Sequence, residues 1–218
     1  DLDFIIVSLR TIPTNLEGIR RFLDVFRNGL VVPLQKEGKE RVVKLLDLEN
    51  LENNEFAVTN QFKLEGSKGS IRADIVLLVN GIPLVLIECK NPTEEKVDWT
   101  DAYRQIKRYE GEAPEIFKYV QFSMASDGMK TYHFPNGFSE ESKDFLSVWK
   151  DPYPFKTEEF KDDIFKITIH GLLSKPNLLD LIENFTFIRK EKDKSTKIMT
   201  RYMQFRASNR IFQRVINT

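Results

Sequence analysis

The sequence contains a single cysteine, Cys89, and only two histidines, His133 and His170. One cysteine excludes a disulfide within the chain, and so few thiol and imidazole groups exclude a structural zinc site. A reducing cytoplasm is therefore the expected location. The sequence also lacks a signal peptide, and no apolar run approaches the roughly 18 residues that a membrane-spanning helix needs.

The chain has no excess of charge, since 33 Lys and Arg residues balance 33 Asp and Glu residues. A global basic field is therefore absent, and any DNA contact must use a local patch. Glycine and proline are too few for a disordered protein, whereas 17 phenylalanines can build a core. The length of 218 residues suits one domain and part of a second, and a start at Asp1 without Met suggests a fragment.

Hydrophobic periodicity predicts an α/β fold with a mixed central sheet flanked by helices. Residues 1–150 are expected to form one domain and residues 151–218 a mostly helical segment, with the charged stretch 189–197 separating two helices. Thr14 and Glu17 are expected to cap the first helix, although Glu17 could instead be a further metal ligand. The predicted helices are 14–28 and 99–110, and the predicted strands are 42–46, 56–64, 71–79, 82–89, 120–125 and 129–134.

Three charged residues stand out within these apolar strands. Asp74 lies in one strand, and Glu88 and Lys90 end the next, two residues apart and so on one face. Two carboxylates form a hard oxygen site for Mg²⁺, and a lysine can stabilise charge on a phosphate during phosphodiester hydrolysis. Residue types alone favour the alternative, an ion-paired cluster at a strand end. Cys89, between them, is expected to point into packing.

The strand register decides whether these side chains can meet. A two-residue turn at Asn80-Gly81 with regular pairing would place Asp74 on the opposite face from Glu88. One extra residue would bring them together. Gly81 could supply it in a left-handed conformation, and Pro83 also favours irregular pairing because it has no N–H. A bulge in this hairpin is therefore predicted if the site is real.

The helix that follows carries Gln105 and Tyr109, which share a face because they are four residues apart. Arg104, Lys107 and Arg108 lie beside them, so this face could hold a phosphate or orient Lys90. The alternative is an amphipathic helix with a solvated basic side. Lys68 and Arg72 are further candidate DNA contacts. The loop 66–70 around Lys68 does not match the phosphate-binding motif G-x-x-x-x-G-K-[ST].

The run 73–76, the run 80–92 and the pattern Gln105-x-x-x-Tyr109 together resemble the nuclease core of the R subunits of type I restriction enzymes (the HsdR family). That family carries a PD-(D/E)XK site, with an accessory Q-x-x-x-Y motif. The resemblance makes Asp74, Glu88 and Lys90 the catalytic residues, and Asp74 and Glu88 the metal ligands. Ala73 stands where the family often has proline. The match covers residues 20–150, including an approach strand at 53–62.

A second patch, 197–207, resembles the start of the family's ATP-dependent DNA translocase. Gln204 matches its adenine-reading glutamine, although Met203 replaces the usual histidine and an ordinary helical glutamine is the alternative. The resemblance implies Mg²⁺ and ATP as cofactors, double-stranded DNA as substrate, and methyltransferase and specificity subunits as partners. A non-catalytic docking module between motor and methyltransferase is the competing function. A nucleotide-binding fragment is disfavoured because the phosphate loop is missing.

Overall fold

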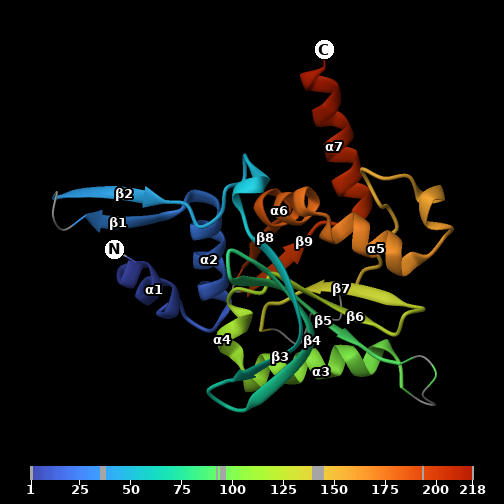
Figure 1. Ribbon diagram of the computed structural model, residues 1–218, viewed down its shortest axis with the longest axis horizontal. Helices are drawn as coiled ribbons and strands as arrows, with labels where there is room; N and C mark the ends of the chain where they lie inside the picture. Colours follow the sequence, from blue (N-terminus) through green and yellow to red (C-terminus); the bar gives the residue numbers. More distant parts are fainter. Residues whose placement is uncertain are drawn as a thin grey trace.

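The computed structural model describes residues 2–34, 38–91, 93, 97–138, 145–192 and 194–217. At its centre lies a five-stranded sheet in which only the β5–β6 pairing is parallel. The sheet order is β3-β4-β5-β6-β7, with bounds Phe56–Glu65, Ser70–Val79, Ile82–Cys89, Phe122–Ser126 and Thr131–Pro135. Helix α3, Trp99–Glu112, connects the two parallel strands (Figure 1). The mixed sheet and its flanking helices confirm the predicted fold class.

Each face of the sheet is buried in its own apolar cluster. On one face, Val76 and Leu86 pack with α3 and with α4, Pro114–Phe117. On the other face, Val85 and Ile87 pack with helices from both ends of the chain. These helices are α2, Leu16–Asn28, α5, Ile164–Leu173, and α6, Lys175–Asn184 (Figure 1). The strands that carry Asp74 and Glu88 are therefore covered on both sides, as their nearly continuous apolar runs predict.

The remaining elements lie outside the sheet. Two of them are helices, α1 (Leu2–Arg10) and α7 (Tyr202–Ile216). Two are hairpins, β1–β2 (Leu30–Leu34 and Lys39–Val43) and β8–β9 (Thr186–Glu191 and Lys194–Met199). Short 3-10 turns lie at Leu51–Asn53 and Thr157–Phe160. The β1–β2 hairpin and α7 project from the body of the molecule (Figure 1). The charged stretch 189–197 separates two helices, α6 and α7, as predicted, but its described residues form most of the hairpin β8–β9 within a segment expected to be mostly helical. No helix in the described part of the chain is long and apolar enough to cross a membrane.

The predicted bulge is present in the β4–β5 hairpin, but not at Gly81. Asn80 and Gly81 have φ of 50° and 76°, and Val79 pairs with Ile82 across a tight two-residue turn. The register shifts one step further on, between the Leu78–Pro83 and Leu77–Val85 pairs. Leu84 is the extra residue, and both it and Val85 face the same apolar cluster. The irregularity therefore lies next to Pro83, whose missing N–H favours it.

A second irregularity lies between β3 and β4. Gln61 has a left-handed φ of 51°, while the pairs Asn60–Ile75 and Phe62–Ala73 on either side keep one register. Ala73 and Val76 nevertheless both pack on the α3 side, although an odd separation normally places two residues on opposite faces. The alternation of side chains in β4 is therefore interrupted between Ala73 and Val76. Asp74 lies within this interruption, opposite Gln61 of β3.

The first long helix begins slightly later than predicted. Asn15, not Thr14, caps α2, because its Oδ1 accepts a hydrogen bond of 3.0 Å from the Gly18 N–H. Glu17 is not a cap partner either. Both of its carboxylate oxygens accept hydrogen bonds from Arg20 instead. Gly29, with φ of 82°, ends the helix as expected.

Candidate active site

Asp74 and Glu88 are brought together by the bulged pairing of β4 with β5. The Asp74 N–H donates to Glu88 Oε1 at 3.0 Å, and the Cys89 N–H donates to Asp74 Oδ2 at 3.0 Å. Each carboxylate is therefore held by the backbone of the neighbouring strand. The two acidic groups lie on one face of the sheet, toward α3, as the sequence predicts for this site.

Glu88 is the more deeply placed of the two acids. Its side chain is completely buried, and Oε2 has no hydrogen-bond partner among the described residues. Burial, together with the nearby negative charge of Asp74, raises the pKa of Glu88 to about 8, although Lys90 acts in the opposite direction. A carboxylate oxygen buried without a partner is costly unless a proton or a cation neutralises it.

Lys90 is anchored to α3 through the two accessory residues. Its Nζ donates to Gln105 Oε1 at 2.5 Å, and Gln105 Nε2 donates to the Tyr109 hydroxyl at 2.5 Å. The hydroxyl in turn donates to the Arg72 carbonyl at 2.6 Å. This chain of hydrogen bonds returns to β4 two residues before Asp74. Gln105 and Tyr109 therefore orient Lys90. The sequence had left open whether this helix face orients Lys90 or holds a phosphate.

The chemistry of these donors fits a divalent cation. Two carboxylates and nearby backbone carbonyls are the hard oxygen ligands that Mg²⁺ prefers, and Glu88 Oε2 is the unpartnered atom that such an ion would satisfy. No group of three or more His, Cys, Asp or Glu side chains that could hold a metal occurs in the described residues. A bound ion would thus depend on Asp74 and Glu88, with water or backbone oxygens completing its shell.

Gln61 is a site residue to which the sequence assigned no role. Its Nε2 donates to Asp74 Oδ1 at 3.1 Å, and its Oε1 accepts a hydrogen bond from Arg72 Nε. A lone exposed amide in an alternating strand carries no local signal. Only the register of the β3–β4 pairing places it beside Asp74.

The predicted DNA-contacting residues are solvent-accessible, and those on α3 have acidic neighbours. Arg104 pairs with Asp101 at 2.8 Å, Arg108 lies 3.7 Å from Glu112, and Lys107 pairs with Glu110. The backbone of Lys68 is tied to the end of α3, where its N–H donates to the Glu112 carbonyl at 3.1 Å. The DNA-binding roles of Lys68, Arg72, Arg104, Lys107 and Arg108 stay predictions.

Other candidates lie apart from the two carboxylates. Gln204 Oε1 accepts hydrogen bonds from the Arg201 N–H and the Thr200 hydroxyl at the start of α7, so the side chain caps this helix. Its nucleotide-binding role stays a prediction. Cys89 packs against the opposite face, and burial raises the pKa of its thiol to about 11, which disfavours a nucleophilic role. His133 is buried beside Trp149, which supports a core position.

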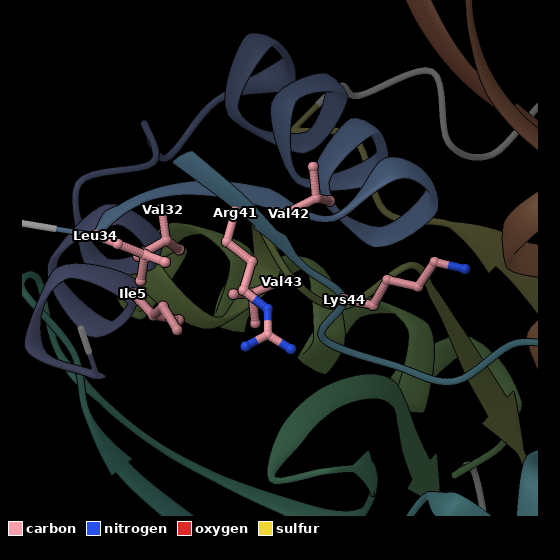
Figure 2. Close-up of a pocket in the computed structure, with 7 residues that line it drawn as sticks. All are labelled: Ile5, Val32, Leu34, Arg41, Val42, Val43 and Lys44. Carbon is pink, nitrogen blue, oxygen red and sulfur yellow. The ribbon is translucent and has the colours of Figure 1, made fainter. Parts of the chain in front are cut away.

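Figure 2 shows a separate pocket between α1 and the β1–β2 hairpin. Its lining is apolar apart from two basic side chains, and consists of Ile5, Val32, Leu34, Arg41, Val42, Val43 and Lys44. These labelled residues include no carboxylate, and none of them contacts Asp74 or Glu88 through a described hydrogen bond. The pocket therefore has no part in the chemistry considered above.

Comparison with known proteins identifies the family to which the chain belongs. The family model described as "Type I restriction enzyme R protein N terminus" matches residues 5–141. A Methanocaldococcus jannaschii protein, provisionally named type I restriction enzyme MjaVIIIP endonuclease subunit, is 38% identical over 199 residues, which are 89% of this chain and 19% of that protein. The type I restriction enzyme HindI endonuclease subunit of Haemophilus influenzae is 33% identical over 196 residues, which are 86% of this chain and 18% of that protein.

The chain spans about a fifth of the length of these curated relatives. The family model covers well over half of the chain, including β3, β4, β5 and α3, which carry Asp74, Glu88, Lys90 and their hydrogen-bond partners. The chain therefore belongs to the family of type I restriction enzyme R protein N-terminal regions, as part of an endonuclease subunit.

Proposed function

We propose that this domain cleaves double-stranded DNA by Mg²⁺-dependent hydrolysis of a phosphodiester bond, with Asp74, Glu88 and Lys90 as its catalytic residues. The observation that carries the proposal is the buried Glu88 Oε2, which has no described partner and lies beside a second carboxylate and a positioned lysine. Membership of the restriction endonuclease family supports the same reading.

The roles of the residues follow from their contacts. Asp74 and Glu88 would hold Mg²⁺, which supplies Lewis-acid stabilisation of the phosphate charge when it is bound. Water attacks phosphorus and one phosphorus–oxygen ester bond breaks, so negative charge develops on the phosphate oxygens. Lys90, oriented by Gln105, would place its ammonium against that charge. Tyr109 would hold Gln105 in the required rotamer.

In the complete protein we expect this reaction to be coupled to ATP-driven DNA translocation. Methyltransferase and specificity subunits are the expected partners, and the cytoplasm is the expected location. The relatives are about five times longer than the matched region, so there is room for a motor in such a chain. The start of the motor within 151–218 and the ATP contact of Gln204 belong to this proposal.

The test is plasmid cleavage by the assembled restriction enzyme carrying Asp74→Ala, Glu88→Ala or Lys90→Ala. Each variant should lose cleavage by several orders of magnitude, and chelation of divalent cations should abolish the activity of the wild type. Circular dichroism and thermal unfolding should show that each variant remains folded. Wild-type cleavage rates in all three variants would end the proposal.

Titration calorimetry with Mn²⁺ separates an enzyme from a non-catalytic docking module on the same scaffold. An enzyme should bind Mn²⁺ in a manner that Asp74→Asn or Glu88→Gln removes. A docking module should bind no Mn²⁺ at these residues, and its variants should change only the assembly of the complex.

A further inference from the structure

Gln61 combines an unusual backbone with a direct contact to a candidate metal ligand. Its φ of 51° lies in the left-handed region, which residues with a Cβ adopt rarely. The residue lies within β3, between the pairs Asn60–Ile75 and Phe62–Ala73, and so opposite Asp74. Backbone irregularities of this kind cluster beside functional sites, where surrounding structure maintains them.

The side chain of Gln61 has a single orientation that satisfies both of its neighbours. Arg72 can only donate a hydrogen bond and an ionised Asp74 can only accept one. The Oε1 atom must therefore face Arg72, and Nε2 must face Asp74 Oδ1, which it reaches at 3.1 Å. The Cys89 N–H binds the other oxygen, Oδ2, at 3.0 Å. The Asp74 carboxylate is thus held from both sides, by β3 and by β5.

We propose that Gln61 is a positioning residue that fixes the Asp74 carboxylate in the orientation required to bind a divalent cation, with Arg72 orienting the Gln61 amide. The inference rests on the proposed function, because it assumes that Asp74 binds the metal. Partners that hydrogen-bond to ligating side chains fix their geometry, and the loss of one such partner typically costs roughly 10- to 100-fold in metal affinity or activity.

A purely structural role of Gln61 would require only its backbone conformation and not its side chain. Phe56 packs on the α2 side of the sheet, whereas Phe62 and Leu64 pack on the α3 side, so β3 changes face near Gln61. That change needs only a left-handed backbone, which glycine adopts more readily than glutamine. The hydrogen bond to Asp74 needs the amide. Gln61→Gly therefore keeps the backbone role and removes the side-chain role.

The experiment compares Gln61→Gly with Asn60→Gly, which truncates a neighbouring exposed amide that is not bonded to Asp74 in the structure. Mn²⁺ binding by the full-length subunit is measured by calorimetry, and plasmid cleavage by the assembled enzyme is measured over a series of Mn²⁺ concentrations. Gln61→Gly should weaken Mn²⁺ binding by roughly 10- to 100-fold without lowering the thermal unfolding temperature. Cleavage should need correspondingly more Mn²⁺ and should largely recover at saturation. Asn60→Gly should bind Mn²⁺ as the wild type does.

Asp74→Asn should abolish Mn²⁺ binding. Measuring it alongside Gln61→Gly distinguishes failure of the positioning role of Gln61 from failure of the proposed nuclease function. Wild-type Mn²⁺ affinity in Gln61→Gly, alongside loss of binding in Asp74→Asn, would overturn the positioning role and leave the nuclease proposal intact. Absence of Asp74-dependent binding in the wild type would overturn both. If Gln61→Gly does not fold, Gln61→Asn replaces it, because asparagine also tolerates the left-handed region and its shorter amide falls short of Asp74.

Discussion

At the scale of single residues, the site depends on two carboxylates in different surroundings. Asp74 is partly exposed and accepts hydrogen bonds on both oxygens, whereas Glu88 is fully buried and has one oxygen without a described partner. Burial disfavours the charged form of Glu88 and raises its pKa to about 8. Without a metal, Glu88 should be largely protonated at pH 7, and binding of a cation should release that proton.

The raised pKa of Glu88 makes the stability of the metal-free protein depend on pH. The unfolded state releases this proton near pH 4.5 and the folded state near pH 8, so the free energy of unfolding should fall as pH rises between these values. Glu88→Gln, which stays neutral, should lose this dependence and become the more stable protein by about 1–4 kcal/mol at pH 8. Urea unfolding in the presence of chelator at pH 5 and pH 8 measures the difference. Parallel pH profiles for the two proteins would contradict the raised pKa.

At the scale of elements, the β4–β5 hairpin determines whether the acids meet. Asn80-Gly81 and Pro83 predicted a hairpin with a bulge from sequence, and both the hairpin and a bulge are present. The suggested position of the bulge, Gly81, was wrong, because Leu84 and Val85 both pack on one cluster and Leu84 is the extra residue. Local sequence shows that a strand is irregular, whereas the core selects the residue at which the register shifts.

Two glycines in these elements should respond in opposite ways to alanine. Gly81 has φ of 76°, and an added Cβ would meet no atom within 4 Å, so Gly81→Ala should destabilise the protein by about 1–2 kcal/mol through the backbone alone. Gly111 lies within α3, also with free space for a Cβ, so Gly111→Ala should stabilise it by about 0.5–1 kcal/mol. Urea unfolding of both variants provides the comparison. Stabilisation by Gly81→Ala would contradict the left-handed conformation of Gly81, and destabilisation by Gly111→Ala would contradict the open helical position of Gly111.

At the scale of the whole molecule, the C-terminal third completes the core of the sheet domain. Residues after 150 contribute six fully or almost fully buried side chains to the cluster that covers α2 and one face of the sheet: Leu172, Leu178, Leu179, Leu181, Ile182 and Phe205. Lys197 is also buried, and its Nζ donates a hydrogen bond to the Val120 carbonyl at 3.4 Å. The candidate site therefore lies on a sheet whose core includes residues from both ends of the chain.

Truncation after residue 150 should therefore prevent stable folding. Each of the six apolar side chains contributes about 1.5–3 kcal/mol by burial, and their sum is comparable with the whole stability of a domain. We expect the fragment 1–150 to show no cooperative urea transition, while the full 218 residues unfold cooperatively. The point variant Leu181→Ala, with a smaller cost of about 2–5 kcal/mol, is the graded control. A cooperative transition of the fragment at the midpoint of the full chain would contradict the shared core.

The sequence by itself determined the α/β class, the hairpin and the candidate trio Asp74, Glu88 and Lys90, because these depend on periodicity, turn residues and charges placed within apolar strands. Tertiary structure alone decided the position of the bulge, the burial of Glu88 and the contact of Gln61 with Asp74. It also turned the charged stretch 189–197 into a hairpin. Local composition does not fix these features, since each depends on how the strands pair and on what the sheet packs against.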